Sequence, residues 1–207
     1  MSTDAGSTLR LATAIDEDAG LVPPPPLAGK TVIHVGDSMV GGDWGLTAAL
    51  KAKFVKEGVG KFVRDYKVSE TLKSYDKGTR LGDLLKEHDP DIVIVTLGTN
   101  DATLPNPTVM APYVEGIAKK IAAPRPNGTS RECWWMGPPL WKPDTGILST
   151  IRDHSAPCKF YDGSKLKIAR AEDGIHPTDH GGQTWANAFW LVFRAPQKPL
   201  LPDAGAP

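Results

Sequence analysis

The 207-residue sequence carries no excess charge of either sign, because its lysines and arginines number 24 and its aspartates and glutamates also number 24. This balance argues against a polyanion such as nucleic acid as the main partner. No apolar run approaches the roughly 20 residues that a membrane-spanning helix needs. The start of the chain, MSTDAGSTLR, also lacks the apolar core of a signal peptide. The sequence therefore predicts no nucleic-acid partner and no transmembrane segment.

Cysteine is almost absent. The two cysteines, Cys133 and Cys158, are too few for a disulfide scaffold. Both fall at the starts of predicted strands, which leaves room for a single bridge. We expect two buried free thiols instead, and cysteine usage then says little about the compartment.

The two ends of the chain differ in composition from its middle. Residues 1–29, with a proline run at 23–26, and residues 195–207 are rich in proline, alanine, glycine and acidic residues. Such segments bury too little apolar surface to balance their ordering entropy, so we expect a disordered linker and a disordered tail. Because no signal peptide is recognisable, we expect that the protein is either cytoplasmic or has had a leader sequence removed. A proline-rich lead-in is typical of a tethered domain, so we favour a periplasmic or secreted location, although a plain disordered tail explains it equally well.

Between residues 30 and 194, short apolar runs alternate with helical patterns. Strands are predicted at 31–35, 61–68, 91–98, 132–137 and 158–163, and helices at 45–58, 79–88, 109–123, 147–154 and 179–194. This alternation predicts one α/β domain with a five-stranded parallel sheet covered by helices on both sides. Functional groups of such a sheet gather beyond the carboxyl ends of the strands.

Three polar clusters follow predicted strands at that edge. Gly-Asp-Ser occupies 36–38, Gly-Thr-Asn-Asp occupies 98–101, and Asp-Gly-Ile-His-Pro-Thr occupies 173–178. Each cluster alone is more often a turn or a helix cap. Their common position at strand ends favours a shared site.

The residue types in these clusters suit nucleophilic catalysis. Ser38 needs a base to take its proton, and His176 is suited to that role. Asp173 precedes His176 by three residues and can orient the imidazole. The Asn100 side-chain amide and the Ser38 backbone N–H are candidate donors to a developing oxyanion.

The stretches VIHVGDSMV, DIVIVTLGTND and DGIHPT together resemble the blocks of the SGNH hydrolase superfamily, also called GDSL-type esterases and lipases, over roughly residues 30–194. The resemblance implies a three-layer α/β/α flavodoxin-like sandwich and hydrolysis of an ester or related acyl bond, with no metal or organic cofactor. Ser38 stands at the nucleophile of this superfamily and Asn100 at its oxyanion-hole asparagine. Asp173 and His176 stand at its Asp-x-x-His pair.

One block departs from the superfamily pattern. Where the superfamily usually has a glycine whose N–H completes the oxyanion hole, this sequence has Glu70. The backbone N–H of Glu70 is still a candidate third donor, provided that its carboxylate points away or pairs with a cation such as Lys67 or Lys73. Alternative alignments place Ser74 or Gly78 at this position. Carbohydrate O-acyl esterases of the superfamily often vary here, which favours that class.

A metal site is the main rival interpretation of the last cluster. Asp173, His176 and His180 have residue types that bind metals, and the two histidines are four residues apart. Pro177 restricts His176 to an extended conformation and so breaks the helical face that such a site needs. We therefore predict no metal.

Two tryptophans are candidate substrate-binding residues. Trp44 follows closely after Ser38, and Trp141 lies in the loop after the fourth predicted strand. Either ring can serve as a stacking platform for a sugar or as a wall for an acyl chain, although packing of a loop onto the domain explains both equally simply.

The sequence predicts a serine esterase that hydrolyses carboxylic ester bonds through an acyl-enzyme. The expected substrate is a small-molecule or saccharide ester with a short acyl group, such as an O-acetyl group on a carbohydrate. A non-catalytic carbohydrate-binding or scaffolding module on the same fold, and an O-acyltransferase, are the alternatives. The acyl length, the alcohol and the oligomeric state are left open.

Overall fold

Five parallel strands make a single sheet in the computed structural model, which describes residues 22–196. The strands are β1 (Thr31–Gly36), β2 (Lys61–Tyr66), β3 (Ile92–Thr96), β4 (Glu132–Met136) and β5 (Lys159–Tyr161). Their order across the sheet is β2-β1-β3-β4-β5, which is the flavodoxin-like doubly wound order. The predicted fold class is confirmed.

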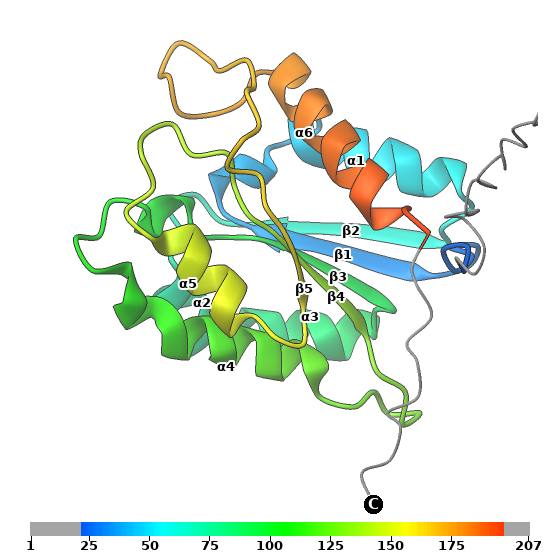
Figure 1. The fold of residues 1–207 in the computed structure, drawn as a ribbon. Helices are drawn as coiled ribbons and strands as arrows, with labels where there is room; N and C mark the ends of the chain where they lie inside the picture. The colour runs from blue at the N-terminus through cyan, green and yellow to red at the C-terminus, as the bar shows by residue number, and fades with distance from the viewer. Residues whose placement is uncertain (1–21, 197–207) are drawn as a thin grey trace, which may run out of the picture. The chain divides into compact units, whose positions relative to one another are not determined.

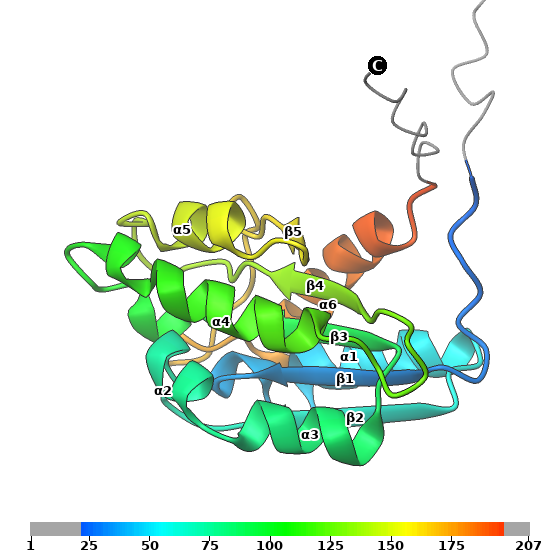
Figure 2. The same cartoon turned by 90° about the horizontal axis from the view of Figure 1, so that it is seen from below.

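Helices cover both faces of this sheet (Figure 1 and Figure 2). They are α1 (Gly45–Lys56), α2 (Leu72–Lys77), α3 (Arg80–His88), α4 (Ala111–Ala122), α5 (Ile147–His154) and α6 (Asp179–Phe193). Helices α1 and α6 pack together on one face, and α2, α3, α4 and α5 lie on the other. All five predicted helices are present, whereas the short helix α2 was not predicted.

The apolar core has two parts, one on each face of the sheet. Strand β3 is buried along its whole length, as expected of a continuous β-branched run inside a parallel sheet. Its alternate side chains enter different clusters, Val93 and Val95 on the side of α2 to α5, and Ile92 and Ile94 on the side of α1 and α6. This double burial fixes β3, and with it the polar residues that follow it.

The two cysteines form a disulfide, so the expectation of free thiols was wrong. Trp134 of β4 pairs with Lys159 of β5, and this register brings the preceding residues, Cys133 and Cys158, side by side. Their Cα atoms are 4.5 Å apart, within the range that a disulfide spans. The sequence alone does not show which strands are neighbours or how they are aligned.

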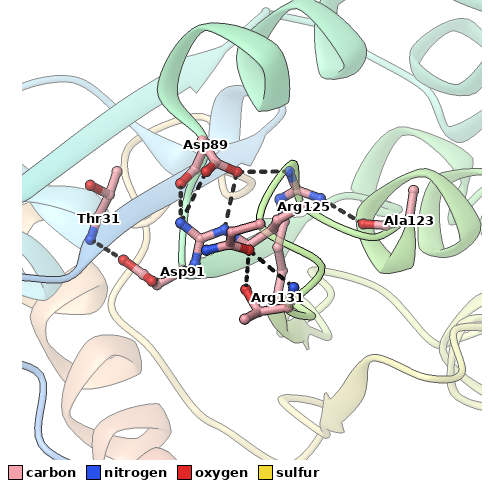
Figure 3. Close-up of polar contacts among 8 residues, drawn as sticks. Thr31, Asp89, Asp91, Ala123, Arg125 and Arg131 are labelled. Atoms are coloured by element: carbon pink, nitrogen blue, oxygen red, sulfur yellow. Dashed lines mark hydrogen bonds and ion pairs between the residues drawn. The ribbon is translucent and has the colours of Figure 1, made fainter.

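The amino ends of the strands are joined by ion pairs at the edge opposite the polar clusters (Figure 3). Arg125 pairs with Asp89 at 3.1 Å and with Asp91 at 2.7 Å, and Arg131 pairs with Asp89 at 3.1 Å. The other carboxylate oxygen of Asp91 accepts the Thr31 N–H at 2.8 Å, so the network also reaches the start of β1. Hydrogen bonds from Arg125 hold the pKa of the Asp89 carboxyl below its usual range. These contacts fix the loops before β3 and β4.

Most of the predicted linker and tail lies outside the described residues. Within them, Leu27 is buried in the core and Arg194 donates to the Pro25 carbonyl at 2.8 Å, so the last part of the predicted linker packs on the domain. No helix among residues 22–196 has the length and apolar character needed to cross a membrane.

Candidate active site

Ser38 lies on a tight turn directly after strand β1, which lies between β2 and β3 in the sheet. A Cβ atom at Gly36 would overlap the Thr96 carbonyl, so a glycine is required where β1 ends beside β3. Asp37 caps the 3₁₀ turn η1 (Ser38–Val40) by accepting the Met39 N–H at 2.9 Å. The Ser38 N–H is the first of that turn and has no acceptor among the described residues, as is usual for the first donor of a helix. The turn therefore presents a hydroxyl and a free N–H from one residue.

A turn around Asp173 holds His176 in place before helix α6. One carboxylate oxygen of Asp173 accepts the N–H groups of Ile175 at 2.8 Å and His176 at 2.9 Å. The His176 carbonyl accepts the Ala171 N–H at 2.8 Å, which closes the loop on itself. Asp173 and His176 are therefore fixed relative to each other by their own backbone.

Ser38, His176 and Asp173 form a hydrogen-bonded chain. His176 Nδ1 lies 2.6 Å from Asp173 Oδ2, and His176 Nε2 lies 2.8 Å from Ser38 Oγ. Because a carboxylate only accepts, Nδ1 carries the proton and Nε2 accepts from the serine hydroxyl. The hydrogen bond from His176, aided by the backbone donors, lowers the pKa of Asp173 to about 2. The structure thus brings together residues that are 138 positions apart in sequence.

Asn100 lies at the same edge, in the 3₁₀ turn η2 (Thr99–Asp101) that follows β3. Its side-chain Nδ2 donates to the Glu70 carbonyl at 2.8 Å. Strand β1 lies between β2 and β3, so Ser38 is flanked by the loop of Glu70 on one side and by Asn100 on the other. All three sequence blocks meet at this edge.

Glu70 does not offer a free N–H in this structure. Its N–H donates to the Lys67 carbonyl at 3.2 Å in a turn where Ser69 has a φ of 61°. The alternative donors are also engaged, because the Ser74 N–H donates to Thr71 Oγ1 at 3.2 Å and the Gly78 N–H donates to the Ser74 carbonyl at 3.0 Å. The remaining candidate donors are the Ser38 N–H and the second amide hydrogen of Asn100.

The Glu70 carboxylate is buried, with 4% of the side chain exposed, and it faces cations. It pairs with Arg80 at 3.0 Å and with Lys67 at 3.9 Å, and it accepts a hydrogen bond from the Ser74 hydroxyl. Arg80 also pairs with Asp65 at 2.7 Å. Lys67 was predicted as a partner, but Arg80 was missed because it lies ten residues further on, at the start of helix α3, and has no motif around it.

Arg170 is a second residue that the sequence did not reveal. Its guanidinium donates to the Pro139 carbonyl at 2.6 Å and to the carbonyl of Ile175, the neighbour of His176. It thereby ties the loop after β4 to the loop that carries His176. No motif or residue spacing in the sequence marks a single arginine that bridges two loops.

The two candidate tryptophans lie in different surroundings. Trp44 precedes helix α1 and is 52% exposed. Trp141 is partly buried and lines a cavity of about 550 Å³ together with Leu140, Arg170 and residues 164–168. Arg170 joins this cavity to the His176 loop. Binding of substrate by either ring stays a prediction.

Buried titratable groups lie directly behind the nucleophile turn. Burial, reinforced by the nearby negative charge of Asp101, raises the pKa of Asp37 to about 7. Burial also raises the pKa of Asp101.

His34 is a core histidine of strand β1. It is fully buried, with Nε2 at 2.9 Å from Thr96 Oγ1 and Nδ1 at 2.9 Å from Thr47 Oγ1. Thr47 Oγ1 donates its hydrogen to the Val40 carbonyl at 2.6 Å, so it accepts from His34. Burial lowers the pKa of His34 to about 3, and the neutral ring links the nucleophile turn to α1 and β3.

Within residues 22–196, no three His, Cys, Asp or Glu side chains are grouped as metal ligands. Both ring nitrogens of His176 are engaged, one with Asp173 and the other with Ser38.

Comparison with known proteins gives a family match. A family model described as "Protein of unknown function (DUF459)" matches residues 31–145, more than half of the chain. The chain belongs to the DUF459 family. The match to DUF459 includes Ser38, Glu70 and Asn100 and ends before Asp173 and His176.

This DUF459 chain is also similar to individual proteins. It is 25% identical over 218 residues to Protein BcsX of Komagataeibacter xylinus, covering 86% of this chain and 81% of that protein. Est24, a carbohydrate acetylesterase from Sinorhizobium meliloti, has a TM-score of 0.65 at 16% identity, covering 79% of this chain and 98% of Est24. The aryl esterase of M. smegmatis has a TM-score of 0.63 at 16% identity, covering 80% of this chain and 100% of the esterase. The resemblance to SGNH hydrolases is confirmed at the level of the fold.

Proposed function

We propose that this DUF459 chain is a serine ester hydrolase with Ser38 as its nucleophile. The observation that carries the proposal is the chain of hydrogen bonds from Ser38 Oγ to His176 Nε2, at 2.8 Å, and from His176 Nδ1 to Asp173 Oδ2, at 2.6 Å. A hydroxyl in contact with a correctly oriented neutral imidazole is the arrangement that activates serine. Ester hydrolysis by this route needs no further reagent than water.

The reaction has two steps. Ser38 Oγ attacks the acyl carbon while His176 takes its proton, and the alcohol then leaves with the electron pair of the broken C–O bond and with that proton. The product of this step is an acyl-serine. His176 next removes a proton from water, whose oxygen attacks the acyl carbon. The bond between that carbon and Ser38 Oγ then breaks, Oγ takes the proton from His176, and the acid leaves. Asp173 stays ionised throughout and stabilises the imidazolium.

The negative charge that develops on the acyl oxygen needs donors. The Ser38 N–H is free among the described residues and lies on the same turn as the nucleophile. Asn100 uses only one amide hydrogen on Glu70, which leaves the second for the oxyanion. Removing one such donor typically lowers kcat by about 10²- to 10³-fold.

We further propose a short acyl group carried by a bulky alcohol such as a carbohydrate. The triad is open to solvent, with 35% of the His176 side chain and 45% of the Asp173 side chain exposed, which leaves room for a large leaving group. The similarity to a carbohydrate acetylesterase, Est24, agrees with this substrate class. The cavity beside Trp141 gives a sugar ring a surface on which to stack.

The test is turnover of p-nitrophenyl esters of graded acyl length and release of acetate from acetylated oligosaccharides. Ser38→Ala abolishes both, whereas Ser130→Ala, which removes an exposed serine before β4, leaves both unchanged. Acetyl esters are turned over faster than long-chain esters. Wild-type rates in the Ser38→Ala protein would refute the proposed function.

The same assay separates the alternative functions. An O-acyltransferase releases p-nitrophenol but moves the acetyl group to an added oligosaccharide, which mass spectrometry detects. A non-catalytic binding module gives no turnover above that of Ser38→Ala and still binds the oligosaccharide.

A further inference from the structure

Glu70 occupies the position at which SGNH hydrolases usually have an oxyanion-hole glycine, and its contacts indicate a different role. Its N–H is engaged with Lys67, and its carboxylate faces Arg80 rather than the nucleophile. Its carbonyl, however, accepts the Asn100 amide at 2.8 Å. The residue therefore acts on the site through its carbonyl oxygen.

This contact decides how the Asn100 amide lies. A carbonyl only accepts, so the NH₂ end of Asn100, and not its oxygen, faces the loop of Glu70. The amide is planar, and one fixed hydrogen bond sets the direction of the second N–H. Without the acceptor, the last torsion of an asparagine is broad and roughly two-fold, and its oxygen can replace its NH₂ group. An oxygen at this place would repel an oxyanion.

The position of the Glu70 carbonyl depends on the loop around it, and several contacts fix that loop. The buried carboxylate of Glu70 is bound by Arg80 at 3.0 Å and by the Ser74 hydroxyl. Arg80 begins helix α3 and also pairs with Asp65 in β2, at 2.7 Å. A second link joins the same loop to the Asn100 turn, since the Leu72 N–H donates to Asp101 Oδ2 at 3.0 Å. The loop is thus fixed to β2, α3 and η2.

We propose that Glu70 is a positioning residue for the reaction: its carboxylate, held by Arg80 and Ser74, fixes the loop whose carbonyl orients the Asn100 amide toward the oxyanion. The inference rests on the proposed esterase function. Glu70 touches no reacting atom, and its effect on turnover passes entirely through Asn100.

A double-mutant cycle tests this coupling. The four proteins are the wild type, Glu70→Ala, Asn100→Ala and the double variant, with kcat and KM measured on p-nitrophenyl acetate and active sites titrated with a fluorophosphonate. Asn100→Ala lowers kcat by about 10²-fold or more. Glu70→Ala lowers kcat by about 10-fold with KM within about twofold, and in the Asn100→Ala background it changes kcat by less than about twofold, because coupled residues act non-additively.

Glu57→Ala is the matched control, since Glu57 is also paired with an arginine, Arg194, at 3.3 Å, but lies at the end of α1. It leaves kcat unchanged. Where Glu70→Ala does not fold, Glu70→Gln carries the same cycle, because it keeps the side-chain size and an acceptor for Ser74 while removing the charge opposite Arg80.

The outcomes are distinct. A full effect of Asn100→Ala combined with an independent, additive effect of Glu70→Ala overturns the inference and leaves the esterase function standing. A kcat of Glu70→Ala equal to that of the wild type also overturns the inference and leaves the esterase function standing. Wild-type turnover in Asn100→Ala and in Ser38→Ala overturns both proposals.

Discussion

At the scale of single residues, Asp173 shows how a local turn and a catalytic proposal depend on the same side chain. Its two oxygens receive two backbone N–H groups and the His176 ring, all within three residues. These donors keep its pKa at about 2. The carboxyl is therefore ionised in the folded protein above about pH 2, and its contribution to the site is lost only as the pH falls from about 4 toward that value.

Asp173→Asn tests this role. The amide keeps the size of the side chain but loses the charge that selects the His176 tautomer, so kcat falls by about 10²- to 10⁴-fold with a small change in KM. Steady-state kinetics at several pH values measure it. Asp162→Asn, at another exposed aspartate that accepts a backbone N–H, leaves kcat unchanged. Equal rates for Asp173→Asn and the wild type would mean that His176 is oriented by other groups.

The pKa of Asp37 is shifted in the opposite direction to that of Asp173, so we expect the opposite dependence of stability on pH. Because burial raises its pKa to about 7, the folded state binds a proton that the unfolded state releases above about pH 4. The wild type therefore loses stability as the pH rises from about 4 to about 7, by up to a few kcal/mol. Asp37→Asn keeps an acceptor for the Met39 N–H but has no carboxyl group to titrate. The melting temperature of the variant relative to that of the wild type therefore rises as the pH increases from about 4 to about 7. A difference that is independent of pH, measured by calorimetry, would contradict the account.

The sequence was sufficient to predict the residues that meet at the site but not those that support them. Ser38, Asn100, Asp173 and His176 each belong to a short motif after a strand, and parallel strands bring such motifs to one edge. Arg80 joins Glu70 to Asp65, and Arg170 joins the carbonyls of Pro139 and Ile175. Such contacts depend on three-dimensional packing that no local pattern encodes.

At the scale of elements, helix α6 positions His176 by packing closely on α1. A Cβ atom at Gly182 would overlap the backbone of Gly45 and Leu46, so the two helices meet backbone to backbone. Gly182→Ala forces them apart and lowers the free energy of unfolding by about 1–3 kcal/mol, as overpacking does. Urea unfolding measures the loss.

Gly82→Ala in α3 is the matched control. Nothing lies within 4 Å of its would-be Cβ atom, so alanine gains helix propensity there at no steric cost. We expect the free energy of unfolding to rise by up to about 1 kcal/mol. If Gly182→Ala and Gly82→Ala change the free energy of unfolding in the same direction, close packing of α1 on α6 is not the cause of the Gly182→Ala effect.

The disulfide is a second element-scale feature, joining β4 to β5 across 25 residues of sequence. Closing a loop of this size stabilises the folded state by about 3 kcal/mol. We expect reductant to lower the urea midpoint of the wild type by a corresponding amount and to leave that of Cys133→Ala/Cys158→Ala unchanged. Two reactive thiols in the native, unreduced protein would contradict the bridge.

All five strands and five of the six helices were predictable from the sequence, and helix α2 was not. Strand β3 is marked by a continuous apolar run, and the five longer helices have apolar periodicity or clear ends. Helix α2 spans six residues, too few for a period to repeat, and it is held by Thr71 and Ser74 capping each other.

At the scale of the whole described molecule, the ion pairs and the proposed catalytic residues lie at opposite edges of the sheet. The amino edge carries the ion pairs of Arg125 and Arg131 (Figure 3), and the carboxyl edge carries the Ser38, His176 and Asp173 chain. The alternation of strands and helices in the sequence was enough to predict that the polar clusters lie at the carboxyl edge. The flavodoxin-like strand order, which puts Ser38 between Glu70 and Asn100, was implied by the resemblance to SGNH hydrolases. The ion pairs of the amino edge were not predicted.

The central claim is that Ser38 is an activated nucleophile, and the most direct measurement is covalent labelling by a fluorophosphonate, with the modified peptide identified by mass spectrometry. We expect one adduct per chain on Ser38, none in Ser38→Ala, and labelling at least about 10²-fold slower in His176→Ala. Labelling at another residue, or an unmodified Ser38 in the wild type at a probe concentration that saturates a known serine esterase, would contradict it.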